Sequence, residues 1–182
     1  MEGRQIVKTL ETGGVGVLLT DTLYGVVGQA LNKKTVERIY TIKDRDDKKP
    51  LIILIASVQD LRLFGVKLNH TIEKILENFW PGAVSVILPC PLKKFDYLHR
   101  GTKMLAFRLP NKKSLIELLK TTGPLVAPSA NPEGLLPAKN TREAMDYFGN
   151  RVDFYERGGR PKNKHSTIVV LRSNGEVGIA RK

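Results

Sequence analysis

Hydrophobic and polar positions along this chain follow two interleaved patterns, one with helical and one with strand periodicity. Apolar residues spaced three and four positions apart predict helices, whereas short apolar runs bounded by glycine or proline predict strands. Helical spacing covers residues 5–11, 33–43, 72–80, 111–120 and 141–149. Strand patterns cover residues 15–20, 51–56, 84–88, 104–109, 125–127, 167–171 and 176–180. This order predicts a sheet with helices packed on it.

Three local features refine the predicted sheet. Residues 51–56 form a continuous apolar run, which is typical of a strand buried on both faces. Ser57, with Asp60 three residues later, matches a capping box and predicts that a helix begins there. The last two strands follow one another directly, so part of the sheet is expected to be antiparallel. We therefore predict an α/β fold with a mixed parallel and antiparallel sheet.

Length and composition are those of an ordinary globular protein. The 182 residues suffice for one domain with a buried core, and we expect residues 1–182 to form a single domain. Cys90 is the only cysteine, which excludes an internal disulfide, and it lies between two prolines as a structural residue. No segment has the roughly 18 consecutive apolar residues of a membrane helix. These features predict a cytoplasmic protein that is not bound to a membrane.

The net charge of +12 is the first indication of function. Such an excess raises the local concentration of anions, which suits a polyphosphate ligand, direct contact with tRNA or another RNA, or both. A role in solubility fits equally well, so the charge alone does not decide between these interpretations.

Four polar segments could carry chemistry. Thr20 to Gly25 follow a predicted strand, where hydroxyl and N–H groups can meet a ligand or can simply form a turn. Lys43, Arg45, Lys48 and Lys49 follow a predicted helix; they could grip phosphates, or they could interact with the helix dipole and the interleaved aspartates.

The third and fourth segments end predicted strands. Arg108 lies on an otherwise apolar strand, so it needs a charged partner or a wet cleft, unless that strand is an edge. Ser129 and Asn131, with prolines on both sides, offer neutral hydrogen bonds or an ordinary turn. The sequence contains no P-loop, no GxGxxG and no paired cysteine and histidine spacing for zinc, and its histidines (His70, His99 and His165) are far apart.

Taken together, these segments resemble the Sua5/YciO/YrdC family, and within it the short threonylcarbamoyl-AMP synthases, over nearly the whole chain. The order and spacing of the motifs carry the resemblance. The residues are Thr20-Asp21-Thr22-Leu23-Tyr24-Gly25, Lys43, Arg45, Lys49, Trp80-Pro81-Gly82, Ala106-Phe107-Arg108, Ser129-Ala130-Asn131, Gly134 and Ser166-Thr167-Ile168-Val169.

The resemblance implies a twisted YrdC-like α/β fold with a concave, positively charged face. It implies that ATP, L-threonine and bicarbonate or CO2 are converted to threonylcarbamoyl-AMP and pyrophosphate, with Mg2+ accompanying ATP. A separate protein complex would then transfer the threonylcarbamoyl group to N6 of adenosine 37 in tRNA. An RNA-binding module that uses the same basic face, and a YciO-like paralogue with different nucleotide chemistry, are the alternatives.

The resemblance also implies roles for single residues. The expected catalytic cations are Lys43, Arg45 and Lys49. The expected ATP-binding residues are Arg45, Lys49, Ser129, Asn131 and Arg181. The expected threonine-binding residues are Thr22, Arg108 and Ser166, and no protein ligand to a metal is expected. The chain departs from the family pattern at Leu19, Asp46, Leu54, Met104, Pro137 and Val170, which affects the threonine site more than the phosphate site.

Overall fold

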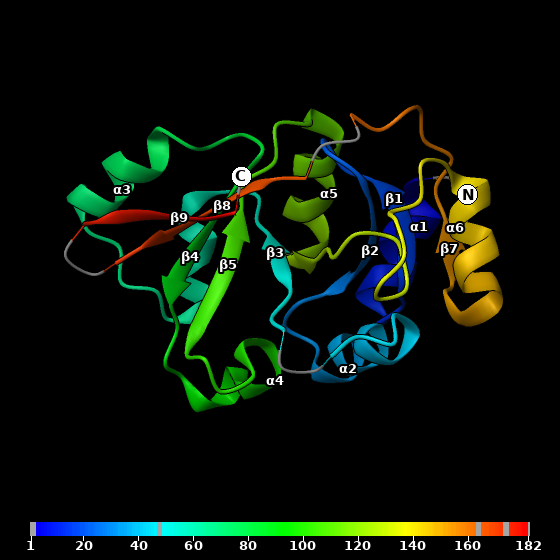
Figure 1. The fold of residues 1–182 in the computed structure, drawn as a ribbon, viewed down its shortest axis with the longest axis horizontal. Coiled ribbons are helices and arrows are strands. Elements are labelled where there is room, and N and C mark those ends of the chain that lie inside the picture. Colours follow the sequence, from blue (N-terminus) through cyan, green and yellow to red (C-terminus); the bar gives the residue numbers. More distant parts are fainter. Residues whose placement is uncertain (1–2, 47–48, 163–164, 173–174, 182) are drawn as a thin grey trace.

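The computed structural model describes residues 3–46, 49–162, 165–172 and 175–181. These residues form a nine-stranded sheet in the order β7-β1-β2-β6-β3-β5-β4-β8-β9 (Figure 1). The strands are β1 (Gly16–Leu19), β2 (Tyr24–Gln29), β3 (Ile52–Leu54), β4 (Val84–Pro89), β5 (Met104–Arg108), β6 (Leu125–Val126), β7 (Phe154–Tyr155), β8 (Thr167–Leu171) and β9 (Val177–Arg181). The α-helices are α1 (Gly3–Glu11), α2 (Lys33–Ile42), α3 (His70–Glu77), α4 (Asp96–His99), α5 (Lys113–Thr122) and α6 (Thr141–Phe148).

The sheet is mixed, as the sequence predicts. Strands β1 and β7, β3 and β5, and β4 and β8 pair in parallel, and the other neighbours pair antiparallel. β3 lies between β6 and β5, and Ile53 and Leu54 are fully buried, which confirms a strand covered on both faces.

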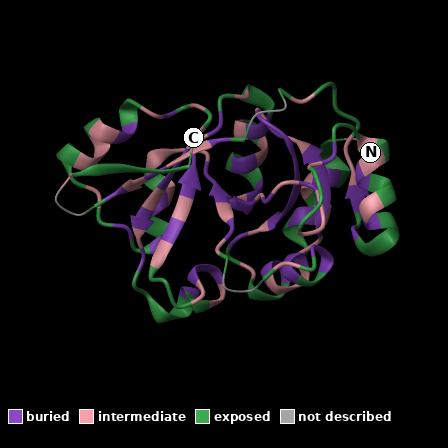
Figure 2. Cartoon of the chain, viewed as in Figure 1, coloured by how far each residue is buried: buried purple, intermediate pink, exposed green. Residues whose placement is uncertain are grey.

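Two hydrophobic clusters cover opposite faces of the sheet. Neighbouring strand residues alternate between them, so Val17 belongs to the larger cluster and Leu18 to the smaller one. Helices α1 and α5 pack on the smaller cluster, whereas α2, α4 and α6 contribute to the larger one. Figure 2 shows the buried strands between exposed helix surfaces. Each fully buried large aliphatic or aromatic side chain stabilises the fold by about 1.5–3 kcal/mol.

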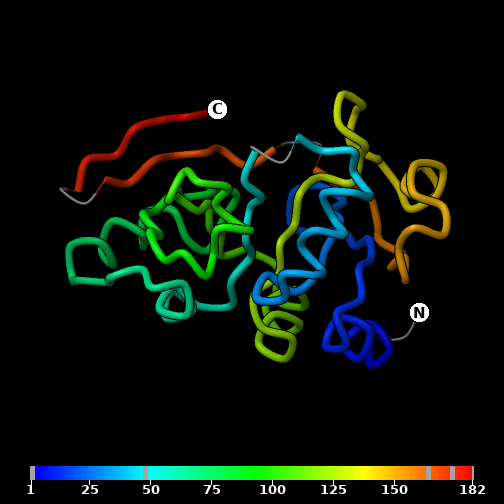
Figure 3. The backbone as a smooth tube through the Cα atoms, turned by 90° about the horizontal axis from the view of Figure 1, so that it is seen from below, coloured from blue at the N-terminus to red at the C-terminus, as the bar shows by residue number. Residues whose placement is uncertain are grey.

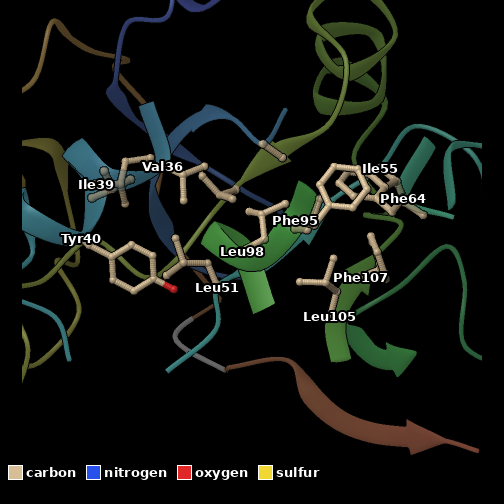
Figure 4. Close-up of a cluster of buried hydrophobic side chains, with 14 of the residues drawn as sticks. Val36, Ile39, Tyr40, Leu51, Ile55, Phe64, Phe95, Leu98, Leu105 and Phe107 are labelled. Carbon is tan, nitrogen blue, oxygen red and sulfur yellow. The ribbon is translucent and has the colours of Figure 1, made fainter. Parts of the chain in front are cut away.

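The centre of the larger cluster joins residues from distant segments (Figure 4). The ring centroids of Phe64 and Phe107 lie 5.1 Å apart, and those of Phe64 and Phe95 lie 5.3 Å apart. Cys90 is buried beside them, and its thiol donates to the carbonyl of Phe64 at 3.0 Å. This contact confirms the interpretation of Cys90 as a structural residue.

Several predicted boundaries are wrong. The sequence pattern missed α4 and β7, which are short, and β2, which contains two glycines. The Ser57–Asp60 capping box is present, but it begins a 3-10 helix, Val58–Phe64. Residue 111, where the predicted helix begins, lies before α5: Lys112 occupies the cap position, and the backbone N–H of Asn111 donates to Asp21.

The last two strands form an antiparallel hairpin along one side of the molecule (Figure 3). Val169 lies opposite Ile179, but Ile168 lies opposite Arg181 rather than Ala180. The extra residue is a β-bulge, which reverses the side on which the following side chain lies. Arg181 therefore shares the face of Ile168. Within the described residues, no helix combines the length and apolar character needed to cross a bilayer.

Candidate functional site

A cavity of about 540 Å3 lies against the sheet on the same face as α1 and α5. Ile52 and Ala127 line the cavity and also pack against the smaller hydrophobic cluster, which places the cavity beside that cluster. Its floor comes from β3, β4, β5 and β8, and its rim comes from loops after β1, α2 and β6. Segments far apart in the sequence therefore meet at one site.

The cavity brings together most of the predicted site residues. Those that line it are Thr22, Arg45, Arg108, Ser129, Ser166 and Arg181. The predicted residues Lys43, Lys49 and Asn131 are not part of this lining. The roles that we expect for these nine residues stay predictions, but the structure divides them into residues that face the cavity and residues that support its rim.

Arg108 is a buried cation with a buried partner. Its guanidinium pairs with Asp21, and both side chains are at most 5% exposed. The second carboxylate oxygen of Asp21 accepts the N–H of Asn111 at 3.0 Å. β5 is an interior strand, so the edge interpretation of Arg108 is wrong. The Nε atom of Arg108 is buried and has no hydrogen-bond partner among the described residues.

Hydroxyl groups lie on two sides of the cavity. The hydroxyls of Thr20 and Thr22 are 3.1 Å apart, and Thr20 also donates to the carbonyl of Leu23 at 2.7 Å. Across the cavity, the hydroxyls of Ser85 and Ser166 are 2.9 Å apart. Because each pair is buried and internally hydrogen-bonded, these hydroxyls have fixed positions.

Arg181 reaches the cavity because of the bulge in β9. Its guanidinium donates to the carbonyl of Ser166 at 2.9 Å. His165, which the sequence analysis did not single out, lies beside it in the cavity lining. Burial lowers the pKa of His165, and the nearby Arg181 charge acts in the same direction, so His165 is favoured as a neutral imidazole.

Lys43 is buried beneath the rim and not in the cavity. Its ammonium donates to the backbone carbonyls of Ser129 and Asn131. The pKa of Lys43 is lowered to about 7, chiefly by burial and also by the positive charge of Arg45, whereas Glu133 opposes the shift. The expectation that Lys43 acts directly among the catalytic cations is therefore not supported by its position.

Lys49 is held by a residue that the sequence analysis did not consider. Its ammonium pairs with Glu133, whose other carboxylate oxygen accepts the N–H of Asp46 at 2.6 Å. Lys49 is thus paired with Glu133, which lies 84 residues further along the sequence. Asp47 and Lys48, which belong to the same predicted cluster, lie outside the described residues.

Among the described cations of this cluster, Arg45 is the one that lines the cavity. It donates to the carbonyls of Lys49 at 3.2 Å and Pro50 at 3.4 Å, and no ion pair to it exists within the described ranges. Its positive charge is therefore available to an anionic ligand.

Asn131 faces its own loop. Its amide nitrogen donates to the carbonyls of Pro132 at 3.0 Å and Leu135 at 2.8 Å. Its buried Oδ1 atom has no partner in the described part of the chain. These bonds shape the loop that follows Ser129.

The cavity combines cations with an apolar floor. Ile87, Met104, Ala106, Ile168 and Val170 form much of the floor, and each is only partly buried. None of the described residues that line the cavity carries a carboxylate, and the described chain has no cluster of three or more metal-binding side chains. A ligand with anionic groups and an apolar or aromatic part fits this lining. Alternate residues of β5 and β8 face the cavity, and apart from Arg108 these residues are uncharged. This alternation in the sequence could therefore have indicated an apolar cavity floor.

The family model Sua5/yciO/yrdC, described as telomere recombination, matches residues 8–182. The chain belongs to this family. The predicted α/β fold and the predicted family are both confirmed.

Several named or solved proteins are similar to this chain over most of its length. The threonylcarbamoyl-AMP synthase of Bacillus subtilis (strain 168) is 30% identical, over 94% of this chain and 53% of its own length. The threonylcarbamoyl-AMP synthase of Marinobacter nauticus is 29% identical, over 90% of this chain and 87% of its own. P. abyssi Sua5, in complex with L-threonine, has a TM-score of 0.85 at 27% identity, over 92% of this chain and 50% of that one. The chain thus spans about half the length of the Bacillus and P. abyssi proteins.

Proposed function

We propose that this protein is an L-threonylcarbamoyladenylate synthase, an ATP-dependent nucleotidyltransferase. It would form threonylcarbamoyl-AMP and pyrophosphate from ATP, L-threonine and bicarbonate or CO2. The observation that carries the proposal is the convergence of Arg45, Arg108 and Arg181 on one cavity whose described lining contains no carboxylate. Named threonylcarbamoyl-AMP synthases in the same family support this choice of reaction.

The arrangement suits the proposed chemistry. The threonine amine would take up CO2 and lose a proton, giving a carbamate. A carbamate oxygen would attack the α-phosphorus of ATP, and pyrophosphate would leave as the phosphorus–oxygen bond breaks. Both reactants are anionic, so cations that are fixed before the reactants meet lower the barrier. Arg45 and Arg181 can supply such charge, and this scheme needs no protein nucleophile.

The proposed threonine site is formed by lining residues other than Arg45. The side chains of Thr22, Arg108 and Ser166 would bind L-threonine, and the guanidinium of Arg108 would meet its carboxylate. Because Asp21 already offsets the charge of Arg108, that contact would act mainly through hydrogen-bond geometry. P. abyssi Sua5 has been solved in complex with L-threonine, which supports placing this substrate in a protein of this fold.

Magnesium would accompany ATP. The cavity lining offers hydroxyls and cations but no described carboxylate, so the fitting ligands for Mg2+ are the phosphates of ATP and water. When bound, Mg2+ would neutralise part of the triphosphate charge. Ser129 would contact the nucleotide, while Lys43, Lys49 and Asn131 would act from the rim.

The proposed product, threonylcarbamoyl-AMP, needs a partner that uses it. Threonylcarbamoyl-AMP is a mixed anhydride and would pass to a protein complex that transfers its threonylcarbamoyl group to adenosine 37 of tRNA. We propose that this takes place in the cytoplasm. Direct contact with tRNA is a further proposal, supported by the net charge of +12.

Pyrophosphate release tests the proposal. We expect release in the presence of ATP, threonine, bicarbonate and Mg2+, and its loss when any one of them is omitted. ATP turnover that does not depend on threonine would favour a YciO-like paralogue. Binding of RNA with a steep salt dependence, and no pyrophosphate release, would favour the RNA-binding module.

A further inference from the structure

Lys43 touches the loop after β6 at three points. It ends helix α2, its exposed fraction is 1%, and its ammonium donates to the carbonyls of Ser129 and Asn131. Its own backbone carbonyl accepts the N–H of Glu133 at 2.9 Å. One buried residue therefore fixes the path of residues 129–133, and these contacts join segments that are 86 and 88 residues apart.

The buried position of Lys43 needs a physical reason. A buried ammonium is unfavourable unless it is hydrogen-bonded, and carbonyls in an irregular buried loop also need donors. Lys43 satisfies both conditions, because one side chain supplies donors to two carbonyls on either side of Ala130. Ser129 lines the cavity, whereas Lys43 does not.

We infer that Lys43 is a positioning residue: it holds the turn of residues 129–131, and so the hydroxyl of Ser129, against the cavity without touching the ligand. The ordering of the turn is independent of the reaction. The consequence for ATP binding rests on the proposed function.

The charge of Lys43 distinguishes this role from a direct phosphate contact. Its pKa of about 7 means that the ammonium loses its proton near neutral pH; Arg45 and Glu133 are the charged groups that act on it. A neutral amine still has two N–H groups and can donate to both carbonyls, but it no longer attracts phosphate by charge. A positioning role therefore survives deprotonation, whereas a phosphate contact does not.

Hydrogen exchange in the ligand-free protein tests the positioning role by itself. In Lys43→Met, we expect the amides of Ser129, Ala130, Asn131 and Glu133 to exchange at least about tenfold faster, because the turn loses two hydrogen bonds. Lys34→Met, on the exposed face of the same helix, should leave this exchange unchanged. Unchanged exchange in a folded Lys43→Met protein would overturn the inference.

If Lys43→Met does not fold, an NMR titration of the unmutated protein tests the same contacts. The carbonyl 13C shifts of Ser129 and Asn131 should titrate together with the side chain of Lys43, because its proton is lost directly beside both carbonyls. Carbonyl shifts that do not follow the Lys43 titration would show that the contacts are absent and would also overturn the inference.

A double-mutant cycle then connects the turn to ATP. We expect Lys43→Met to weaken ATP binding at least about tenfold in the parent protein, but less than about threefold in the Ser129→Ala background. With Ser129 present, the ratio of the Kd for ATP of Lys43→Met to that of the unmutated protein should stay constant from pH 6 to 8.5. Equal effects in both backgrounds, or a ratio that falls to one at high pH, would show a direct phosphate contact instead. Failure of the unmutated protein to bind ATP would reject the proposed function and leave the exchange result standing.

Discussion

At the scale of single residues, the cations near the cavity divide into those that the protein itself neutralises or buries and those that face the ligand space. Lys43 is bound to carbonyls and Lys49 to Glu133, whereas Arg45 has no ion pair within the described residues. The same residue types in one short loop thus have different contacts, because their partners come from elsewhere in the fold.

Arg45 and Lys49 should therefore differ in their contribution to catalysis. We expect Arg45→Ala to lower kcat/KM for ATP at least about tenfold, or roughly 1.4 kcal/mol of transition-state stabilisation. Lys49→Ala should cost less, because the ammonium of Lys49 is already paired with Glu133 outside the cavity lining. Steady-state pyrophosphate release measures both, with Lys34→Ala as the surface control. A larger loss from Lys49→Ala than from Arg45→Ala would contradict this division.

The buried Arg108–Asp21 pair should be important for stability as well as for the site. Arg108→Met leaves the carboxylate of Asp21 buried without its cation, which costs about 3–5 kcal/mol. Asp21→Asn in the same protein should recover part of this loss. The half-exposed pair of Arg38 and Asp153 provides the control, since Arg38→Met should cost about 1 kcal/mol or less. Urea denaturation measures the free energy of unfolding of each variant, and equal losses for the two arginines would refute this view.

At the scale of elements, short irregular features place the site residues. The bulge in β9 puts Arg181 on the face of Ile168, and the loop between β1 and β2 brings Asp21 to Arg108. Sequence periodicity predicted β1, β5, β8 and β9, because each has several apolar positions. It missed β2, which contains two glycines, and β7, which has two residues, because neither gives enough positions for a period.

The pairing of β1 with β7 can be tested through Gly16. A Cβ atom at this position would lie 2.2 Å from the ring of Phe154, which is 2% exposed. We expect Gly16→Ala to displace the ring and to lower the free energy of unfolding by about 1–3 kcal/mol. Gly178→Ala in β9 is the matched control, because a Cβ there meets nothing within 4 Å. Thermal and urea unfolding measure both, and a Gly16→Ala protein as stable as its parent would show that β1 and β7 do not pack this way.

At the scale of the whole molecule, the net charge of +12 acts on association and not on the fold. The field of the entire protein attracts anions before any single contact forms. Sequence composition gives this property directly, since it is a sum over all residues and does not depend on their arrangement.

Salt should therefore affect the association rate constant of ATP more than its dissociation rate constant. We expect the association rate constant for ATP to fall as ionic strength rises from about 0.05 to 0.5 M, because the Debye length shortens to a few ångströms. Charge reversal at the exposed residues Lys93 and Lys94 should lower the same rate and leave the dissociation rate unchanged. Stopped-flow binding separates the two rates. An association rate that does not depend on salt would mean that the charge does not steer this ligand.

The sequence by itself determined the mixed α/β class, most helices and strands, and the motif order by which the family could be named. These features are local: periodicity, apolar runs and spacing are properties of neighbouring residues. Only the tertiary structure decided which charged residues face the cavity. The pairs Lys43–Ser129, Lys49–Glu133 and Arg108–Asp21 span 86, 84 and 87 residues. Only folding brings the two members of each pair together. A lysine or arginine that contacts such a partner stabilises the protein, whereas one without a partner can face a ligand.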